Sequence, residues 1–210
     1  MGSGTIRVGG LCGVVSAAAA MPAYLVGSPE RPDDAAAAQR YVDDAATFLT
    51  ANGTVPLAHL LFGVLFLGVL VATLRSAAGP TGAVYTALIG GTVFVALTAA
   101  GLAAEVAVPA TIVQFGDPSV ADPAFLGLAV WLYHYSHIGS AALIFATAYV
   151  AWRTAVLPKW SAGLAVLGVL PLLHTWVGLP AAYSAAVWIG AMGLLMLAVP
   201  PVVRVHSGVA

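Results

Sequence analysis

Long apolar stretches separated by short polar connections dominate the pattern of this 210-residue chain. A helix needs about 20 mostly apolar residues to cross a hydrocarbon core that is ~30 Å thick, and six stretches have that length. They cover residues 8–26, 55–74, 82–108, 125–152, 160–179 and 181–203. The pattern therefore predicts an all-α fold, a polytopic transmembrane helical bundle of six spans that forms one domain over residues 1–210.

Several local features refine these spans. The third and fourth stretches are longer than a bilayer requires, so they must tilt or project from it. The fifth and sixth meet at Gly178-Leu179-Pro180, where a proline-marked turn predicts a tight helical hairpin. In the first span, Gly9 and Gly13 form a GxxxG pair, a spacing that lets transmembrane helices approach closely.

The first span also has a second interpretation. Arg7, the apolar run and Ala18-Ala19-Ala20 together resemble a secretory signal with its cleavage site. Cleavage would leave five spans and an external amino terminus. We expect an uncleaved helix, which keeps six spans.

The connection between the first two spans is predicted to contain an external amphipathic helix at about residues 33–51. Asp33 and Asp34 suit the positive end of a helix. The apolar residues that follow recur at helical spacing: Tyr41, Ala45, Phe48 and Leu49. Asn52-Gly53 is expected to end the segment. It would act either as a lid on the outer face or as a solvated connector.

Composition strengthens the membrane interpretation. Residues of the AVILMFWYC set make up 61% of the chain and charged residues only 7%, against about 45–50% and about 25% in average globular proteins. So few charges would not cover a soluble surface. The formal net charge of −1 leaves no electrostatic footprint for nucleic acid, and a single cysteine excludes an intrachain disulfide framework or a multi-cysteine metal site.

The charges divide between the two sides of the predicted bundle. One side carries Arg7, Arg75, Arg153, Lys159 and Arg204. The opposite side carries Glu30, Asp33, Asp34, Asp43, Asp44, Asp117 and Asp122, with Arg31 and Arg40 as its cations. Because short positively charged loops stay in the cytoplasm, we predict a multi-pass protein of the cell membrane with both termini cytoplasmic.

Aromatic residues are expected to form belts at the two membrane interfaces. Those near the outer interface are Trp131, Tyr133, Tyr135, Trp176 and Tyr183, and those near the inner interface are Trp152 and Trp160. Tyr133 or Tyr135 has a second possible role as a wall of a pocket beside His134.

Five ionisable residues lie inside the predicted spans: His59, Glu105, His134, His137 and His174. Such residues are costly in a bilayer and indicate functional sites. At ~1.5 Å per residue, His59 and His137 lie about 24 Å above the basic residues that anchor their helices. On the same basis His134 lies about 28 Å and His174 about 22 Å above theirs. Glu105 lies about 36 Å above the start of its helix if that helix is untilted. The histidines therefore share one layer in the outer part of the bilayer.

The faces of these helices point to the same conclusion. His134 and His137 are three positions apart, so they share one face. Pro171 removes a backbone hydrogen bond just before His174 and would help to aim that side chain inward. Glu105 continues a stripe of small and polar residues, Gly91, Thr98 and Gly101. We predict that all five ionisable residues converge on one external-facing pocket.

Three functions fit such a pocket. The first is binding of a transition metal (Zn, Cu or Fe) or haem through His59, His134, His137 and His174, with Glu105 as a ligand or a candidate catalytic base. The second is a non-enzymatic transporter-like or accessory subunit whose histidines are structural or proton-responsive. The third is an intramembrane hydrolase that uses a metal-bound water. The lipid bilayer is the one partner predicted, while protein partners and homo-oligomers stay open.

The sequence also resembles a group of uncharacterised bacterial six-span membrane proteins that carry a domain of unknown function. The resemblance rests on three features. They are Arg7-Val8-Gly9-Gly10-Leu11, the segment from Pro32-Asp33-Asp34 to Leu49 that leads into a span ending at Arg75, and Leu157-Pro158-Lys159-Trp160. It implies the six-span fold and brings no activity with it.

Overall fold

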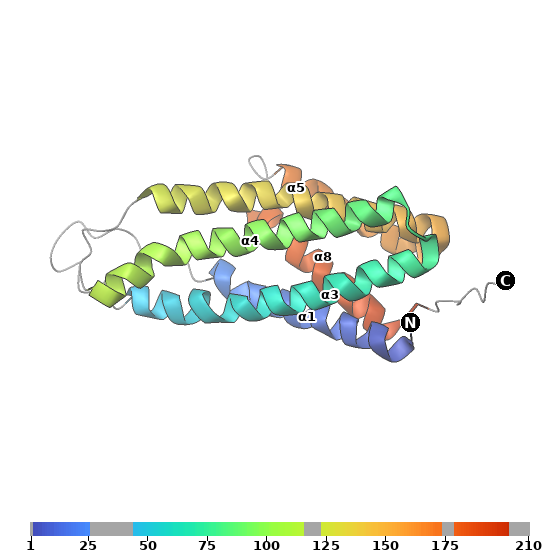
Figure 1. Ribbon diagram of the computed structural model, residues 1–210, viewed down its shortest axis with the longest axis horizontal. Helices are drawn as coiled ribbons and strands as arrows, with labels where there is room; N and C mark the ends of the chain where they lie inside the picture. Colours follow the sequence, from blue (N-terminus) through green and yellow to red (C-terminus); the bar gives the residue numbers. More distant parts are fainter. Residues whose placement is uncertain (1, 26–43, 116–122, 174–178, 202–210) are drawn as a thin grey trace.

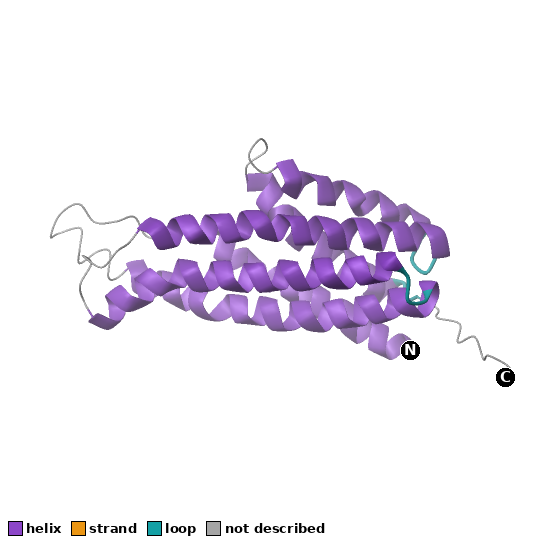
Figure 2. Ribbon diagram, turned by 45° about the horizontal axis from the view of Figure 1, so that its top comes forward, coloured by secondary structure: helices purple, strands orange, loops and turns teal. Residues whose placement is uncertain are grey.

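The computed structural model describes residues 2–25, 44–115, 123–173 and 179–201. Within these ranges the chain is helical throughout and contains no strand (Figures 1 and 2). The four longest elements are α1 (Ser3–Leu25), α3 (Val55–Ala78), α4 (Gly82–Phe115) and α5 (Pro123–Thr154). The final helix is α8 (Leu179–Ala198). The predicted all-α fold class is therefore confirmed.

Neighbouring helices run antiparallel along the long axis of the bundle (Figure 1). The most extensive contacts join α4 to α5, followed by those of α1 with α3 and with α8. As a result, the described basic residues gather at one end, which we call the basic end: Arg7, Arg75, Arg153 and Lys159. The opposite end, which we call the acidic end, holds Asp44 and Glu105.

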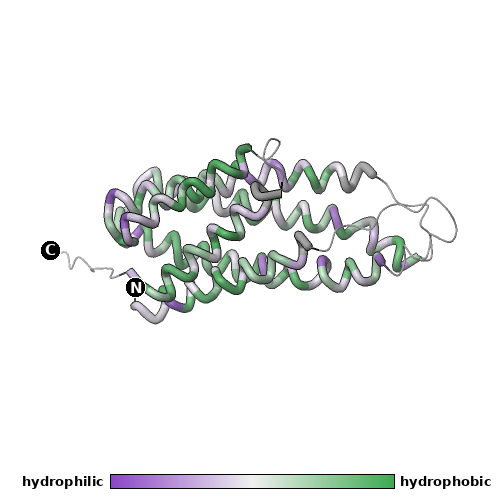
Figure 3. Tube along the Cα trace, turned by 180° about the vertical axis from the view of Figure 1, so that it is seen from behind, coloured by the Kyte–Doolittle hydropathy of each residue, from purple (hydrophilic) through white to green (hydrophobic). Residues whose placement is uncertain are grey.

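Among the described residues, three helical segments are long and apolar enough to cross a membrane: Ser3–Pro22, Asp44–Ala78 and Gly82–Phe115. Hydrophilic positions are scattered singly along the chain in Figure 3, and apolar positions dominate between them. Helix α5 has 32 residues but is not in this group. Its middle carries a polar run from Tyr133 to Ser140, which lowers its apolar character.

Glycine pairs bring two of these helix pairs into backbone contact. A Cβ atom added to Gly139 of α5 would lie 2.7 Å from the carbonyl oxygen of Gly90 in α4. In the same way, a Cβ on Gly193 of α8 would lie 2.7 Å from the carbonyl oxygen of Gly10 in α1. Only glycine fits at these crossings, as is common where small residues let transmembrane helices pack closely.

The GxxxG pair of the first span serves the contact between α1 and α3. Gly9 faces the side chain of Val69, and Gly13 faces the ring of Phe66. Phe66 in turn meets Trp188 of α8 edge to face, with ring centroids 6.4 Å apart. Helix α1 is thus packed between α3 and α8 as a member of the bundle.

The segment before α3 differs from the predicted external helix. Residues 33–43 lie outside the described part of the chain, but Asp44–Ala78 is one continuous helix, so Asn52-Gly53 does not end it. Leu49–Thr54 forms a π-helical turn, η1. Pro56 has no N–H to donate to the carbonyl of Asn52 four residues earlier, so the regular α-helical pattern is interrupted without breaking the helix.

The described part of the fifth predicted span is less regular than expected. Lys159–Leu173 consists of a 3₁₀ turn η3 (Lys159–Ala165), one α-helical turn α6 (Val166–Val169) and a second 3₁₀ turn η4 (Leu170–Leu173). Pro171 lies in the last turn and lacks the N–H that an α-helix needs there. Of the predicted hairpin turn, Gly178 lies outside the described part, whereas Leu179 and Pro180 form the first residues of α8.

Candidate functional site

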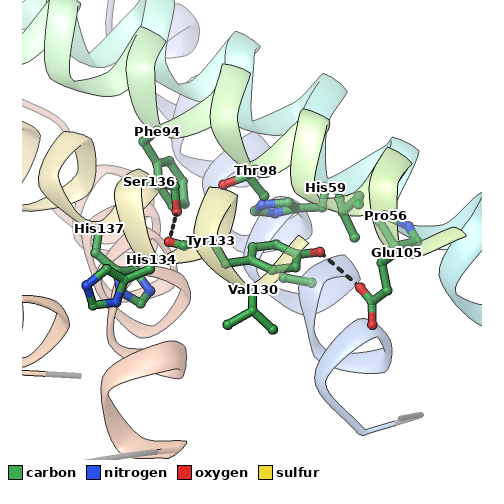
Figure 4. Close-up of a pocket in the computed structure, with 13 residues that line it drawn as sticks. Pro56, His59, Phe94, Thr98, Glu105, Val130, Tyr133, His134, Ser136 and His137 are labelled. Carbon is green, nitrogen blue, oxygen red and sulfur yellow. Dashed lines mark hydrogen bonds between the residues drawn. The ribbon is translucent and has the colours of Figure 1, made fainter. Parts of the chain in front are cut away.

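A cavity of about 290 Å³ lies between the helices in the half of the bundle nearer the acidic end. Helices α1, α3, α4, α5 and α8 all contribute to its wall, and most of the lining atoms are apolar. Figure 4 shows the polar side chains that face it: His59, Thr98, Glu105, Tyr133, His134, Ser136 and His137. A small cavity with a few convergent polar groups is the usual form of a small-molecule site.

Four of the five predicted site residues line this cavity: His59 from α3, Glu105 from α4, and His134 and His137 from α5. The fifth, His174, lies outside the described residues. The predicted stripe on α4 is also present, because Gly91 packs against Leu67, Thr98 lines the cavity and Gly101 faces the Tyr133 ring.

His59 is fixed by hydrogen bonds to α1. Its Nδ1 lies 2.9 Å from the carbonyl oxygen of Ser16 and 3.0 Å from the hydroxyl of the same residue. The hydroxyl lies 3.0 Å from the carbonyl oxygen of His59 and donates to it. A carbonyl oxygen only accepts, so the Nδ1 atom carries a proton, and Nε2 becomes the acceptor of the neutral ring. The side chain is only 6% exposed.

Glu105 and Tyr133 connect α4 to α5 on the other side of the cavity. The Tyr133 hydroxyl donates to Oε2 of Glu105 at 3.2 Å. Gly101 makes room for this pair, because a Cβ atom at that position would lie 3.3 Å from the tyrosine ring. The carboxylate thus holds the tyrosine hydroxyl at the cavity wall.

The hydroxyl of Thr98 lacks the backbone bond that several other threonines of these helices make, as does that of Thr147 in α5. Thr73, Thr92, Thr111 and Thr154 each donate to the carbonyl four residues earlier. The Oγ1 atom of Thr98 is buried and has no hydrogen-bond partner among the described residues. Unsatisfied buried hydroxyls are costly. Because Thr98 lines the cavity, a group bound there would be placed to satisfy it.

The two histidines of α5 lie together at another part of the wall (Figure 4). Their ring centroids are 6.3 Å apart, and the His134 ring also meets Trp131 edge to face at 5.5 Å. The neighbouring serine hydroxyls donate to backbone carbonyls of the same helix. Ser136 donates to the carbonyl of Tyr133, and Ser140 donates to that of His137.

The predicted metal site would need a cluster of ligating side chains. Within residues 2–25, 44–115, 123–173 and 179–201, no three His, Cys, Asp or Glu side chains gather closely enough to hold an ion. His134 and His137 form a pair, while His59 and Glu105 approach the cavity from α3 and α4 (Figure 4). The site as described is therefore a polar-lined cavity with two imidazoles on one side.

Three site residues carry roles that the sequence interpretation did not assign. Tyr133, favoured as an interface aromatic, is half-buried in the cavity wall, which was its second predicted role. Its bond to Glu105 was not predicted. Ser16 and the orphaned hydroxyl of Thr98 depend on how helices meet, which hydropathy does not report.

Comparison with known proteins adds no evidence about the function of this site. No family model, no curated protein and no solved structure matches the chain. The geometry of the cavity and the positions of the charged residues are therefore the evidence for its function.

Proposed function

We propose that this chain is a multi-pass integral membrane protein that binds a small molecule in the cavity, as a transporter-like or accessory binding module. The basic end lies at the cytoplasmic face and the acidic end outside. The observation that carries this proposal is the meeting of Glu105, Tyr133, Thr98 and His59 around one mostly apolar cavity.

Exposed tryptophans support the membrane placement. Trp131 and Trp152 are both exposed on α5 and lie 21 residues apart, which is about 31 Å along a helix. This distance matches a hydrocarbon core of ~30 Å, with one tryptophan at each interface. Trp152 is accompanied by Lys159, whose Nζ lies 5.7 Å from the centre of its ring.

Helix lengths support a position of the cavity near the outer interface. Helix α4 has 34 residues, or about 51 Å, which exceeds the hydrocarbon core by about 20 Å. The basic end closes through a short turn in which the N–H of Gly79 bonds the carbonyl of Arg75. The surplus therefore projects from the opposite side, and the level of Tyr133 and Glu105 corresponds to the outer headgroup region.

A pair of threonine variants tests the binding function. Thr98→Phe fills the cavity, whereas Thr92→Phe places the same bulk on an exposed face of the same helix. Small molecules extracted from protein purified in mild detergent are compared by mass spectrometry. We expect at least one compound in the wild type and in Thr92→Phe that is depleted several-fold in Thr98→Phe. Identical profiles in all three would contradict the proposal.

A second candidate function is metal binding at His134 and His137. The observation that favours it is their shared helix face and ring separation of 6.3 Å, since two imidazoles supply two ligands of a transition-metal site. Haem binding and metal-dependent hydrolysis both depend on this candidate. Metal analysis and an absorption spectrum of the same preparations test it. Stoichiometric metal supports it, a Soret band selects haem, and absence of both removes it.

A further inference from the structure

The polar groups around the cavity are rich in hydrogen-bond acceptors. Glu105 contributes a carboxylate, and the neutral His59 ring contributes Nε2 because its Nδ1 proton is donated to Ser16. Thr98 contributes a hydroxyl oxygen that has no partner among the described residues. All three line the cavity; Figure 4 shows Thr98 and His59 close together and the Glu105 carboxylate beyond the Tyr133 hydroxyl.

Positive charge from lysine or arginine is missing from this wall. The cavity lining in the described part of the chain contains neither residue type, and the described arginines and lysine lie at the basic end. In the sequence, the segments 26–43 and 116–122 hold six carboxylates against two arginines. Such a charge distribution attracts cations and repels anions.

Aromatic rings complete the wall. Phe94 and Tyr133 both line the cavity, and aromatic faces attract ammonium groups as well as apolar groups. Apolar residues such as Leu102 and Val130 make up much of the remaining surface. The wall therefore suits a molecule with one cationic end and an apolar body.

We propose that the ligand is a compact primary ammonium compound with a small apolar body. This inference rests on the proposed small-molecule function and names its ligand class. The ammonium group pairs with the carboxylate of Glu105, while the apolar body packs against the aromatic wall toward Thr98 and His59. Tyr133 acts as a positioning residue, because its hydroxyl holds the carboxylate through the bond to Oε2.

Three probes of matched size test this ligand class: n-butylammonium, n-butanol and butyrate. Binding to the full chain in nanodiscs is measured by calorimetry at pH 8, where an alkylammonium remains protonated because its pKa resembles the ~10.4 of lysine. We expect n-butylammonium to bind about tenfold or more tightly than n-butanol, since hydrogen bonds to charged groups are the stronger kind. Butyrate should bind more weakly than either, because it meets the Glu105 carboxylate.

A matched pair of carboxylate variants locates the effect. Glu105→Gln keeps the size of the side chain and is expected to weaken n-butylammonium at least about tenfold while leaving n-butanol within twofold. Asp44→Asn removes the same charge from an exposed position at the same end and is expected to change either affinity less than twofold. Folding of each variant is checked by circular dichroism.

The outcomes separate this inference from the function on which it rests. Equal binding of n-butanol and n-butylammonium, or indifference to Glu105→Gln, would overturn the ammonium class and leave the small-molecule function standing. Preferred binding of butyrate would also overturn it. If all three probes fail to bind while Thr98→Phe still depletes a co-purified compound, the ligand class is wrong and the cavity function remains. If that compound is also missing, both proposals fail.

Discussion

The hydrogen bonds that a polar side chain makes in this bundle depend on the helix packed against it. His59 illustrates this, because the carbonyl of Ser16 determines which ring nitrogen holds the proton. Its Nε2 is thereby kept as an acceptor at the cavity. The Ser16 hydroxyl adds a bond in the reverse direction, to the carbonyl of His59, so the two residues link α1 and α3 twice.

This double link predicts a modest cost for Ser16→Ala. The variant loses the hydroxyl bonds but keeps the backbone carbonyl that accepts from Nδ1, so we expect the free energy of unfolding to fall by about 1 kcal/mol. Chemical unfolding in mixed micelles measures this difference.

Ser76→Ala is the matched control, because Ser76 is exposed and its hydroxyl bonds only its own helix at Ala72. It should be within about 0.5 kcal/mol of the wild type. Equal losses in the two variants would show that the link between α1 and α3 does not stabilise the fold.

At the scale of elements, close backbone approach organises the bundle. Helices α4 and α5 meet at Gly90 and Gly139, and α1 and α8 meet at Gly10 and Gly193. The crossing at Gly90 and Gly139 lies nearer the basic end than the Tyr133–Glu105 pair. It determines how closely α5 approaches α4. The cavity wall therefore depends on glycines that do not line it.

Gly139→Ala tests this dependence. The added Cβ would lie 2.7 Å from the carbonyl of Gly90 and 2.6 Å from the amide nitrogen of Phe94, so the helices must separate. We expect a loss of about 1–3 kcal/mol in the free energy of unfolding, measured by the same micelle assay.

The control is Gly127→Ala on the same helix, where nothing lies within 4 Å of an added Cβ. Alanine is the better helix former by about 0.8–1 kcal/mol, so this variant should be neutral or more stable. A Gly139→Ala protein as stable as Gly127→Ala would contradict the packing described for α4 and α5.

For the molecule as a whole, the sequence predicted the helical class and the division of charges because both follow from hydropathy and from where charged residues fall. It also brought His59, His134 and His137 to one layer and Glu105 above it, on a common pocket, since depth follows from counting residues along helices. The four do line one cavity.

Helix irregularities and contacts between helices could not be predicted by counting residues along the chain. The continuous helix Asp44–Ala78 arose because Pro56 distorts a helix without ending it. The irregular run Lys159–Leu173 combines a proline with two glycines in a short apolar stretch, which periodicity alone interprets as a regular span. Tyr133 was assigned to an interface because aromatic residues are common there, whereas its partner, Glu105, lies on another helix.

The central claim is that a membrane-embedded cavity opens toward the acidic, extracytoplasmic end. The direct test introduces Thr98→Cys into a Cys12→Ser background and measures modification by a small, membrane-impermeant cationic thiosulfonate in intact cells. Asp44→Cys and Ser76→Cys, both exposed and at opposite ends of the bundle, calibrate access from outside and from the cytoplasm. We predict that the cysteines at 98 and 44 react from outside, that n-butylammonium slows only the reaction at 98, and that the cysteine at 76 reacts only after permeabilisation. Reaction of the cysteine at 98 together with that at 76, or its failure to react in solubilised protein, would contradict the account.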